Sequence, residues 1–199
     1  MTRTGPFHSV VIGCSAGGLD ALRRLFSTLP TELQLRIVVV AHTGPDGDSL
    51  LAELLGKICR LPVVEATEKT VAMAGQIHIA PPGYHLLVER DGTFSLSIDP
   101  KVCNVRPSID VLFQSAADAW GSGLIGILLT GANSDGTEGL RSIKRQGGYT
   151  VVQDPDTAFA DTMPRSAVAA GLADRVLPLE EISIHLLTLP GAMPGRSAP

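Results

Sequence analysis

Short apolar, β-branched runs alternate with amphipathic segments along most of this chain, and this alternation is what most constrains its fold. Residues 36–41, RIVVVA, are apolar at almost every position, which is typical of a strand covered on both faces. Residues 8–13 and 124–130 are similar, and helical patterns follow both. Strand–helix alternation requires right-handed crossovers. It therefore predicts an α/β fold with a doubly wound, mainly parallel sheet and flanking helices.

The other elements follow from the same periodicities. The remaining predicted strands are residues 62–66, 149–153 and 174–178; the predicted helices are residues 18–29, 48–59, 108–120, 135–147, 164–172 and 179–189. In the first helix, Leu19, Leu22, Leu25 and Phe26 share one face, and Asp48 or Ser49 is the expected N-cap of the second. Residues 75–99 instead alternate apolar and polar residues around Pro-Pro-Gly and Asp-Gly turns, which predicts an antiparallel hairpin or meander insertion.

Composition excludes several classes of protein. The formal net charge is −4, no basic run occurs and aromatic residues make up 4%, so we expect no nucleic-acid partner. No segment is long and apolar enough for membrane insertion or a secretion signal, and three widely spaced cysteines fit a reducing compartment. We therefore expect a cytoplasmic protein with one domain over residues 1–190 and a flexible tail over 191–199, which is rich in Pro, Gly and Ser.

The end of the first predicted strand carries an unusual turn. Residues 13–17, GCSAG, match the G-x-S-x-G pattern that exposes a serine between a strand and a helix. Ser15 is then a candidate nucleophile, and the Ala16 N–H at the helix start can stabilise an oxyanion. The pattern alone also fits a packing turn or a phosphate-binding turn.

Two further strand ends carry polar residues. His42 follows the second strand and is a candidate base for Ser15; the alternative is an ordinary loop histidine. Asp135 follows the strand at residues 124–130 and either caps the next helix or orients the His42 imidazole. A dinucleotide site is disfavoured because GCSAGG lacks the G-x-G-x-x-G spacing and no acid ends the second strand.

With these loops in view, residues 7–188 resemble the catalytic domain of the chemotaxis protein-glutamate methylesterases, the CheB family. The matching segments stand in family order: IGCSAGG, VVVAHTGPDGDSLLAELL, IAPPGYHLLV, RPSIDVLFQSAA, GILLTGANSDGTEGL, IKRQGGYTVVQDP and MPRSAVAAG. The resemblance implies hydrolysis of glutamate γ-methyl esters on the cytoplasmic helices of chemoreceptors, and deamidation of glutamines. It implies no metal and no organic cofactor.

The family's catalytic serine, histidine and aspartate fall on Ser15, His42 and Asp135. The resemblance further places Ala16, Gly131 and Ala132 around the oxyanion and the pocket. Met163 either lines the cleft or is a core methionine, and Arg106 either contacts an acidic receptor segment or forms a surface ion pair.

The chain departs from the family pattern at Ala16, Ala41, Thr43 and Ala132, where we expect an altered substrate fit with the chemistry retained. The family's N-terminal receiver domain has no counterpart in the sequence. This leads us to expect either a stand-alone esterase controlled by a partner or by expression, or a piece of a longer protein. A separate receiver or methyltransferase protein is a candidate partner. Two alternatives stay open: an esterase acting on a different protein or small ester, and a non-catalytic chemosensory adaptor.

Overall fold

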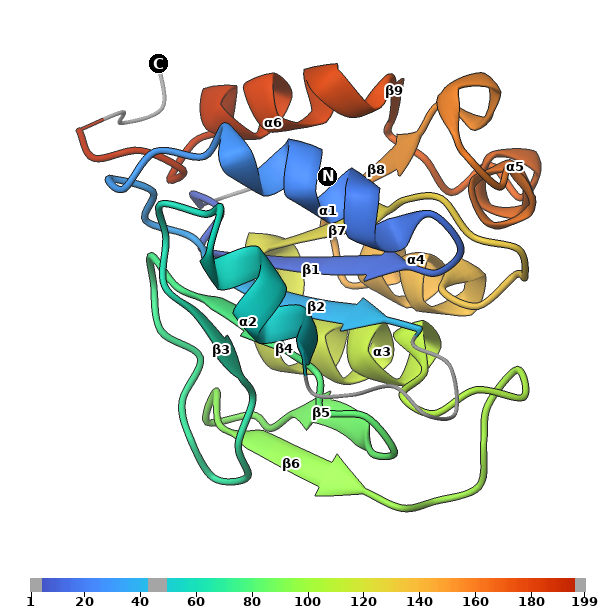
Figure 1. Ribbon diagram of the computed structural model, residues 1–199, viewed down its shortest axis with the longest axis horizontal. Coiled ribbons are helices and arrows are strands. Elements are labelled where there is room, and N and C mark those ends of the chain that lie inside the picture. Colours follow the sequence, from blue (N-terminus) through green and yellow to red (C-terminus); the bar gives the residue numbers. More distant parts are fainter. Residues whose placement is uncertain (1–4, 43–49, 196–199) are drawn as a thin grey trace.

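The computed structural model describes residues 5–42 and 50–195. Within them, seven strands form one sheet in the order β3-β4-β2-β1-β7-β8-β9, and every neighbouring pair is parallel (Figure 1). The strands are β1 (Ser9–Cys14), β2 (Arg36–Ala41), β3 (Val63–Glu65), β4 (Ile77–Ile79), β7 (Leu124–Leu128), β8 (Tyr149–Gln153) and β9 (Arg175–Leu177). The predicted parallel sheet is confirmed.

Helices cover both faces of this sheet, as Figure 1 shows. One layer holds α1 (Gly18–Ser27), α2 (Leu50–Gly56) and α6 (Leu179–Thr188); the other holds α3 (Ile109–Trp120), α4 (Thr137–Arg145) and α5 (Thr162–Ala169). Short 3₁₀ turns follow α3 (Gly121–Gly123) and β8 (Pro155–Thr157).

The central strands supply two hydrophobic cores because successive side chains point to opposite faces. Val10 and Ile12 pack with the first helical layer, whereas Val11 packs with the second. All six residues of β1 are buried, which explains why its sequence lacks polar alternation.

The predicted hairpin is confirmed in part. β5 (His85–Val88) and β6 (Phe94–Ser97) form a separate antiparallel pair that covers α3. Residues 77–79, however, are not part of that insertion: they form β4, a parallel strand beside β2. Both isoleucines and His78 of this strand are buried, so the apparent apolar–polar alternation does not mark a solvated face.

The chain ends fit the predicted division less well. Ala192 is fully buried, and its carbonyl accepts a hydrogen bond of 2.9 Å from the Gln34 N–H, so packing continues past residue 190.

The expected N-cap residues Asp48 and Ser49, together with Thr43, lie outside the described residues. In the ranges 5–42 and 50–195, no helix has the length and apolar character needed to cross a bilayer.

Candidate active site

Ser15 lies in the sharp turn between β1 and α1, at the carboxyl edge of the sheet. Its N–H donates to the Thr130 carbonyl beyond β7 (2.9 Å), and its carbonyl accepts from the Gly18 N–H (2.7 Å). The turn needs its glycines. Gly17 has a φ of 79°, and a Cβ on Gly18 would lie 2.6 Å from the Cys14 sulfur. The backbone can therefore reverse within three residues and leave the serine half-buried at the start of the helix.

His42 occupies the equivalent position on the neighbouring strand. Cys14 of β1 pairs with Ala41 of β2, and the His42 N–H donates to the Cys14 carbonyl (3.0 Å). Ser15 and His42 therefore follow directly on two paired strands. The His42 side chain is 7% exposed, so it is held inside the protein and is not an ordinary surface histidine.

Asp135 reaches the same point from the loop between β7 and α4. One carboxylate oxygen, Oδ2, accepts from His42 Nε2 (2.8 Å) and the Ile109 N–H (2.7 Å). The other, Oδ1, accepts from the Ser108 hydroxyl (2.8 Å) and the Asp110 N–H (3.0 Å). The expected contact between His42 and Asp135 is present. Asp135 also caps a helix, but this is α3 and not the helix that follows it in the chain.

These hydrogen bonds set the charge of Asp135 and the tautomer of His42. Burial alone raises the pKa of the Asp135 carboxyl. The bonds from His42, Asp110, Ile109 and Ser108 outweigh it and hold that pKa below its ordinary value. An ionised carboxylate accepts a hydrogen bond from the Nε2–H group, so the lone pair of the neutral imidazole lies on Nδ1. His42 Nδ1 is buried and has no hydrogen-bond partner among the described residues.

The candidate oxyanion donors differ in availability. Across residues 5–42 and 50–195, no hydrogen bond uses the N–H of Ala16 or that of Ala132. The Gly131 N–H, in contrast, donates to the Ala160 carbonyl (2.9 Å). Gly131 was expected to serve the oxyanion region, but its N–H is not a free donor in this structure.

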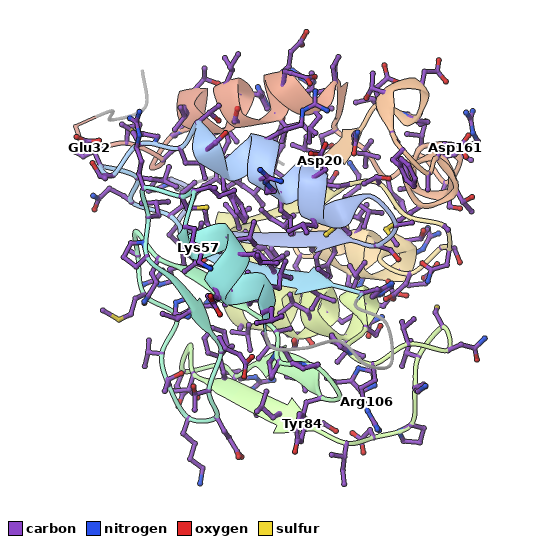
Figure 2. The ribbon with its side chains drawn as sticks, in the orientation of Figure 1. Asp20, Glu32, Lys57, Tyr84, Arg106 and Asp161 are labelled. Carbon is purple, nitrogen blue, oxygen red and sulfur yellow. The ribbon has the colours of Figure 1, made fainter. Side chains whose placement is uncertain are left out.

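Met163 and Arg106 are engaged within the fold. Met163 is fully buried, and a Cβ on Gly131 would lie 2.7 Å from its sulfur. It therefore packs beneath the turn as a core methionine and not as a residue that lines the cleft. Figure 2 shows Arg106 on the same side of the molecule as Tyr84, near the β5–β6 hairpin. Its Nη1 donates to the carbonyls of Ile98 (2.7 Å) and Asp99 (3.0 Å), so the guanidinium ties the loop after β6.

Sequence reasoning missed three residues behind Asp135. Ser108 donates its hydroxyl to Asp135, while its N–H donates to His85 Nδ1 (3.2 Å). His85 Nε2 in turn contacts the Pro100 carbonyl (3.2 Å). Asp110, two residues on from Ser108, is also buried. The segment RPSID carried a signal for two of them, Ser108 and Asp110, since it places two polar side chains at the start of an otherwise apolar helix.

The three cysteines differ in surroundings. Burial raises the pKa of the Cys14 thiol to about 12, which makes it an inert packing group beside the candidate nucleophile Ser15. Cys103 is exposed, and single ligand atoms of Cys103, Asp110 and Asp135 come within 4.8 Å of one another. Both Asp135 oxygens and one Asp110 oxygen already accept N–H or O–H donors, so a cation there would have to displace those bonds.

Comparisons with known proteins agree with this arrangement. A family model described as CheB methylesterase matches residues 10–186. A relative from Leptospira interrogans is 49% identical over 177 residues, spanning 89% of this chain and 92% of the relative. The protein-glutamate methylesterase/protein-glutamine glutaminase of Symbiobacterium thermophilum is 38% identical over 178 residues, and the match spans 49% of its length. The crystal structure of the Thermotoga maritima CheB methylesterase catalytic domain is similar with a TM-score of 0.87 and 35% identity, covering 91% of this chain and 97% of that one.

Proposed function

Because the chain belongs to the CheB methylesterase family, we propose that it hydrolyses glutamate γ-methyl esters on the cytoplasmic helices of chemoreceptors. Ser15 is the nucleophile, His42 the general base and Asp135 the group that orients the base. The observation that carries this proposal is the meeting of three strand ends. The His42 N–H bonds to Cys14, the Ser15 N–H bonds to Thr130, and His42 Nε2 bonds to Asp135 at 2.8 Å.

The proposed mechanism uses His42 Nδ1, which has no hydrogen-bond partner among the described residues and which the Ser15 hydroxyl must approach before a proton can pass. His42 Nδ1 takes the Ser15 hydroxyl proton as Oγ forms a bond to the ester carbonyl carbon. The tetrahedral intermediate then collapses, the bond to the methoxy oxygen breaks, and methanol leaves with the proton from Nδ1. Water attacks the glutamyl–serine ester with His42 again acting as base, which releases the glutamate carboxylate and restores Ser15.

Two features support stabilisation of the intermediate. The Ala16 N–H lies at the start of α1, where the helix dipole favours negative charge. The Ala132 N–H lies on the neighbouring loop and, like that of Ala16, donates to no described residue. Asp135 stays ionised and stabilises the imidazolium formed when the proton is transferred. No step calls for a metal or an organic cofactor.

The relatives' names include protein-glutamine glutaminase, and the same acyl-enzyme serves that reaction with ammonia as the leaving group. Regulation by a separate receiver or methyltransferase protein is part of the proposal. Ala16 and Ala132 keep backbone N–H donors and all three triad residues are present, so the changes at Ala16, Ala41, Thr43 and Ala132 are proposed to alter the fit of the substrate and not the chemistry.

The direct test is methanol release from a methylated receptor fragment, with and without a candidate receiver partner. Wild type should release methanol, and Ser15→Ala should lose the activity while keeping the fold. Ser27→Ala is a matched control, because that hydroxyl lies at the far end of α1 and, among the described residues, bonds only to the Arg24 carbonyl. Undiminished release by Ser15→Ala contradicts the mechanism. Activity on small esters but not on receptors supports a different ester as the substrate, and inactivity on both supports an adaptor.

A further inference from the structure

Asp110 is a buried carboxylate that the triad chemistry does not use. It occupies the second position of α3, and its side chain points across to the start of α4. There its Oδ1 accepts from two backbone donors, the Gly136 N–H (2.9 Å) and the Gly139 N–H (2.7 Å). Gly136 is the N-cap residue of α4, directly after Asp135, and Gly139 lies in the first turn of the helix.

Glycine makes this reach possible. A Cβ on Gly139 would lie 2.4 Å from Phe113 Cβ, and a Cβ on Gly136 would lie 2.9 Å from Ile109 Cγ2. Gly136 also has a φ of 99°, a conformation that other residues rarely adopt. The spacing DGTEG after the β7 loop therefore lets α3 and α4 approach until one side chain can span them.

The two aspartates cap each other's helix. Asp135 accepts N–H groups of Ile109 and Asp110 at the start of α3, while Asp110 accepts those of Gly136 and Gly139 at the start of α4. Neither helix has a side-chain cap from its own N-cap residue. Asp135 is thus held at two points: its carboxylate bonds to the start of α3, and the next peptide bonds to Asp110 through the Gly136 N–H.

The charges around Asp110 make it sensitive to protonation. Burial and the neighbouring carboxylates of Asp135 and Glu138 raise the pKa of Asp110 to about 6, against the opposing effect of the two glycine N–H groups. The His42 imidazole, which bonds to Asp135, and the Cys103 thiol are the other titratable groups near Asp110 and Asp135.

We propose that Asp110 is a positioning residue for the reaction: it fixes the loop that aims Asp135 at His42, and it adds a second negative charge beneath that pair. The proposal rests on the proposed function, but its structural part concerns only the contact between Asp135 and His42.

The test uses the rate at which a fluorophosphonate labels Ser15. In this reaction the Ser15 oxygen–phosphorus bond forms, fluoride leaves and the serine proton passes to His42. Asp110→Ala removes the acceptor, and a loosened Asp135 should slow labelling by about 10²-fold in protein that is still folded. Asp110→Asn keeps an oxygen for both glycine donors, so labelling should stay within about tenfold of wild type, with the acid limb of the rate against pH moved to lower pH. Asp118→Asn, at the other end of α3, should match wild type.

A second readout needs no substrate or nucleophile. In protein with ¹⁵N-labelled histidine, the Nε2–H resonance of His42 reports its bond to Asp135. Asp110→Ala should shift or broaden it, and Asp118→Asn should not. If wild type is not labelled but Asp110→Ala still changes the His42 resonance, the proposed function is contradicted and the positioning role of Asp110 stands. The inference is overturned if the Asp110 variants keep the labelling rate, the pH profile and the His42 resonance of wild type. If Asp110→Ala does not fold, the acid limb of the labelling rate and the His42 resonance of Asp110→Asn decide.

Discussion

Replacing Asp135 with asparagine is the most informative change to the site, because the carboxylate serves two pairs of donors. Oδ2 accepts from His42 Nε2 and the Ile109 N–H; Oδ1 accepts from the Ser108 hydroxyl and the Asp110 N–H. An amide has one oxygen, so its NH₂ group must face one of these pairs. In either orientation, one backbone N–H at the start of α3 loses its acceptor.

The cost can be estimated for each orientation. A buried N–H without an acceptor destabilises a protein by about 1–3 kcal/mol, and we expect a loss of that size in the free energy of unfolding. With NH₂ facing His42, the imidazole must accept at Nε2, so Nδ1 carries the proton and cannot serve as base; the rate falls about 10⁴-fold. With NH₂ facing Ser108, the tautomer survives but the charge is lost. A charge-assisted bond worth about 1.5–3 kcal/mol then corresponds to about a 10- to 10²-fold loss.

The assay combines urea unfolding with fluorophosphonate labelling of Asp135→Asn. Ser108→Ala is the matched comparison, because it removes one hydroxyl donor and leaves both Oδ2 bonds in place; its rate should fall less than that of Asp135→Asn. A folded Asp135→Asn protein that reacts at the wild-type rate refutes the assigned role of Asp135.

Two further predictions follow from the same region. Gly139→Ala places a Cβ 2.4 Å from Phe113 Cβ, so α3 and α4 must separate, and we expect about 1–3 kcal/mol less stability by urea unfolding. Gly56→Ala in α2 is the matched control, because its φ is not positive and its Cβ would meet only Val63 Cβ at 4.0 Å; its stability should not fall. The pKa of Asp110 is raised from 3.8 to about 6, so between these values the folded state binds a proton that the unfolded state releases. The stability that protonated Asp110 contributes is therefore full below about pH 4 and is lost as pH rises through 6. Asp110→Asn should therefore gain stability relative to wild type between pH 4.5 and 7.5, by up to about 3 kcal/mol, and an unchanged difference across that range contradicts the assignment.

The parallel sheet was predictable because its central strands are buried on both faces and contain almost no polar residues. β4 was not, since a three-residue strand with a histidine at its centre resembles half of a hairpin. The predicted apolar face of α1 was wrong at one position: Leu19 is 41% exposed, whereas Leu22, Leu25 and Phe26 are buried. It lies in the first turn, before the helix is covered by its neighbours.

The site divides in the same way. Ser15, His42 and Asp135 could be found because each follows a strand, and the ends of neighbouring parallel strands lie together. The contact between Asp110 and the first turn of α4 could not, because it depends on how closely two helices approach. Nor does the sequence indicate that the Gly131 N–H bonds to Ala160, since that requires the backbone path of the loop after β8.

The proposed reaction depends on Ser15 as the nucleophile that His42 and Asp135 activate. The most direct measurement is peptide mass spectrometry after brief reaction with a fluorophosphonate, which locates the covalent adduct on the chain. We predict one adduct on the peptide that contains Ser15, strongly reduced in His42→Ala and absent in Ser15→Ala. An adduct on another residue, or undiminished labelling of the Ser15→Ala protein, contradicts the account.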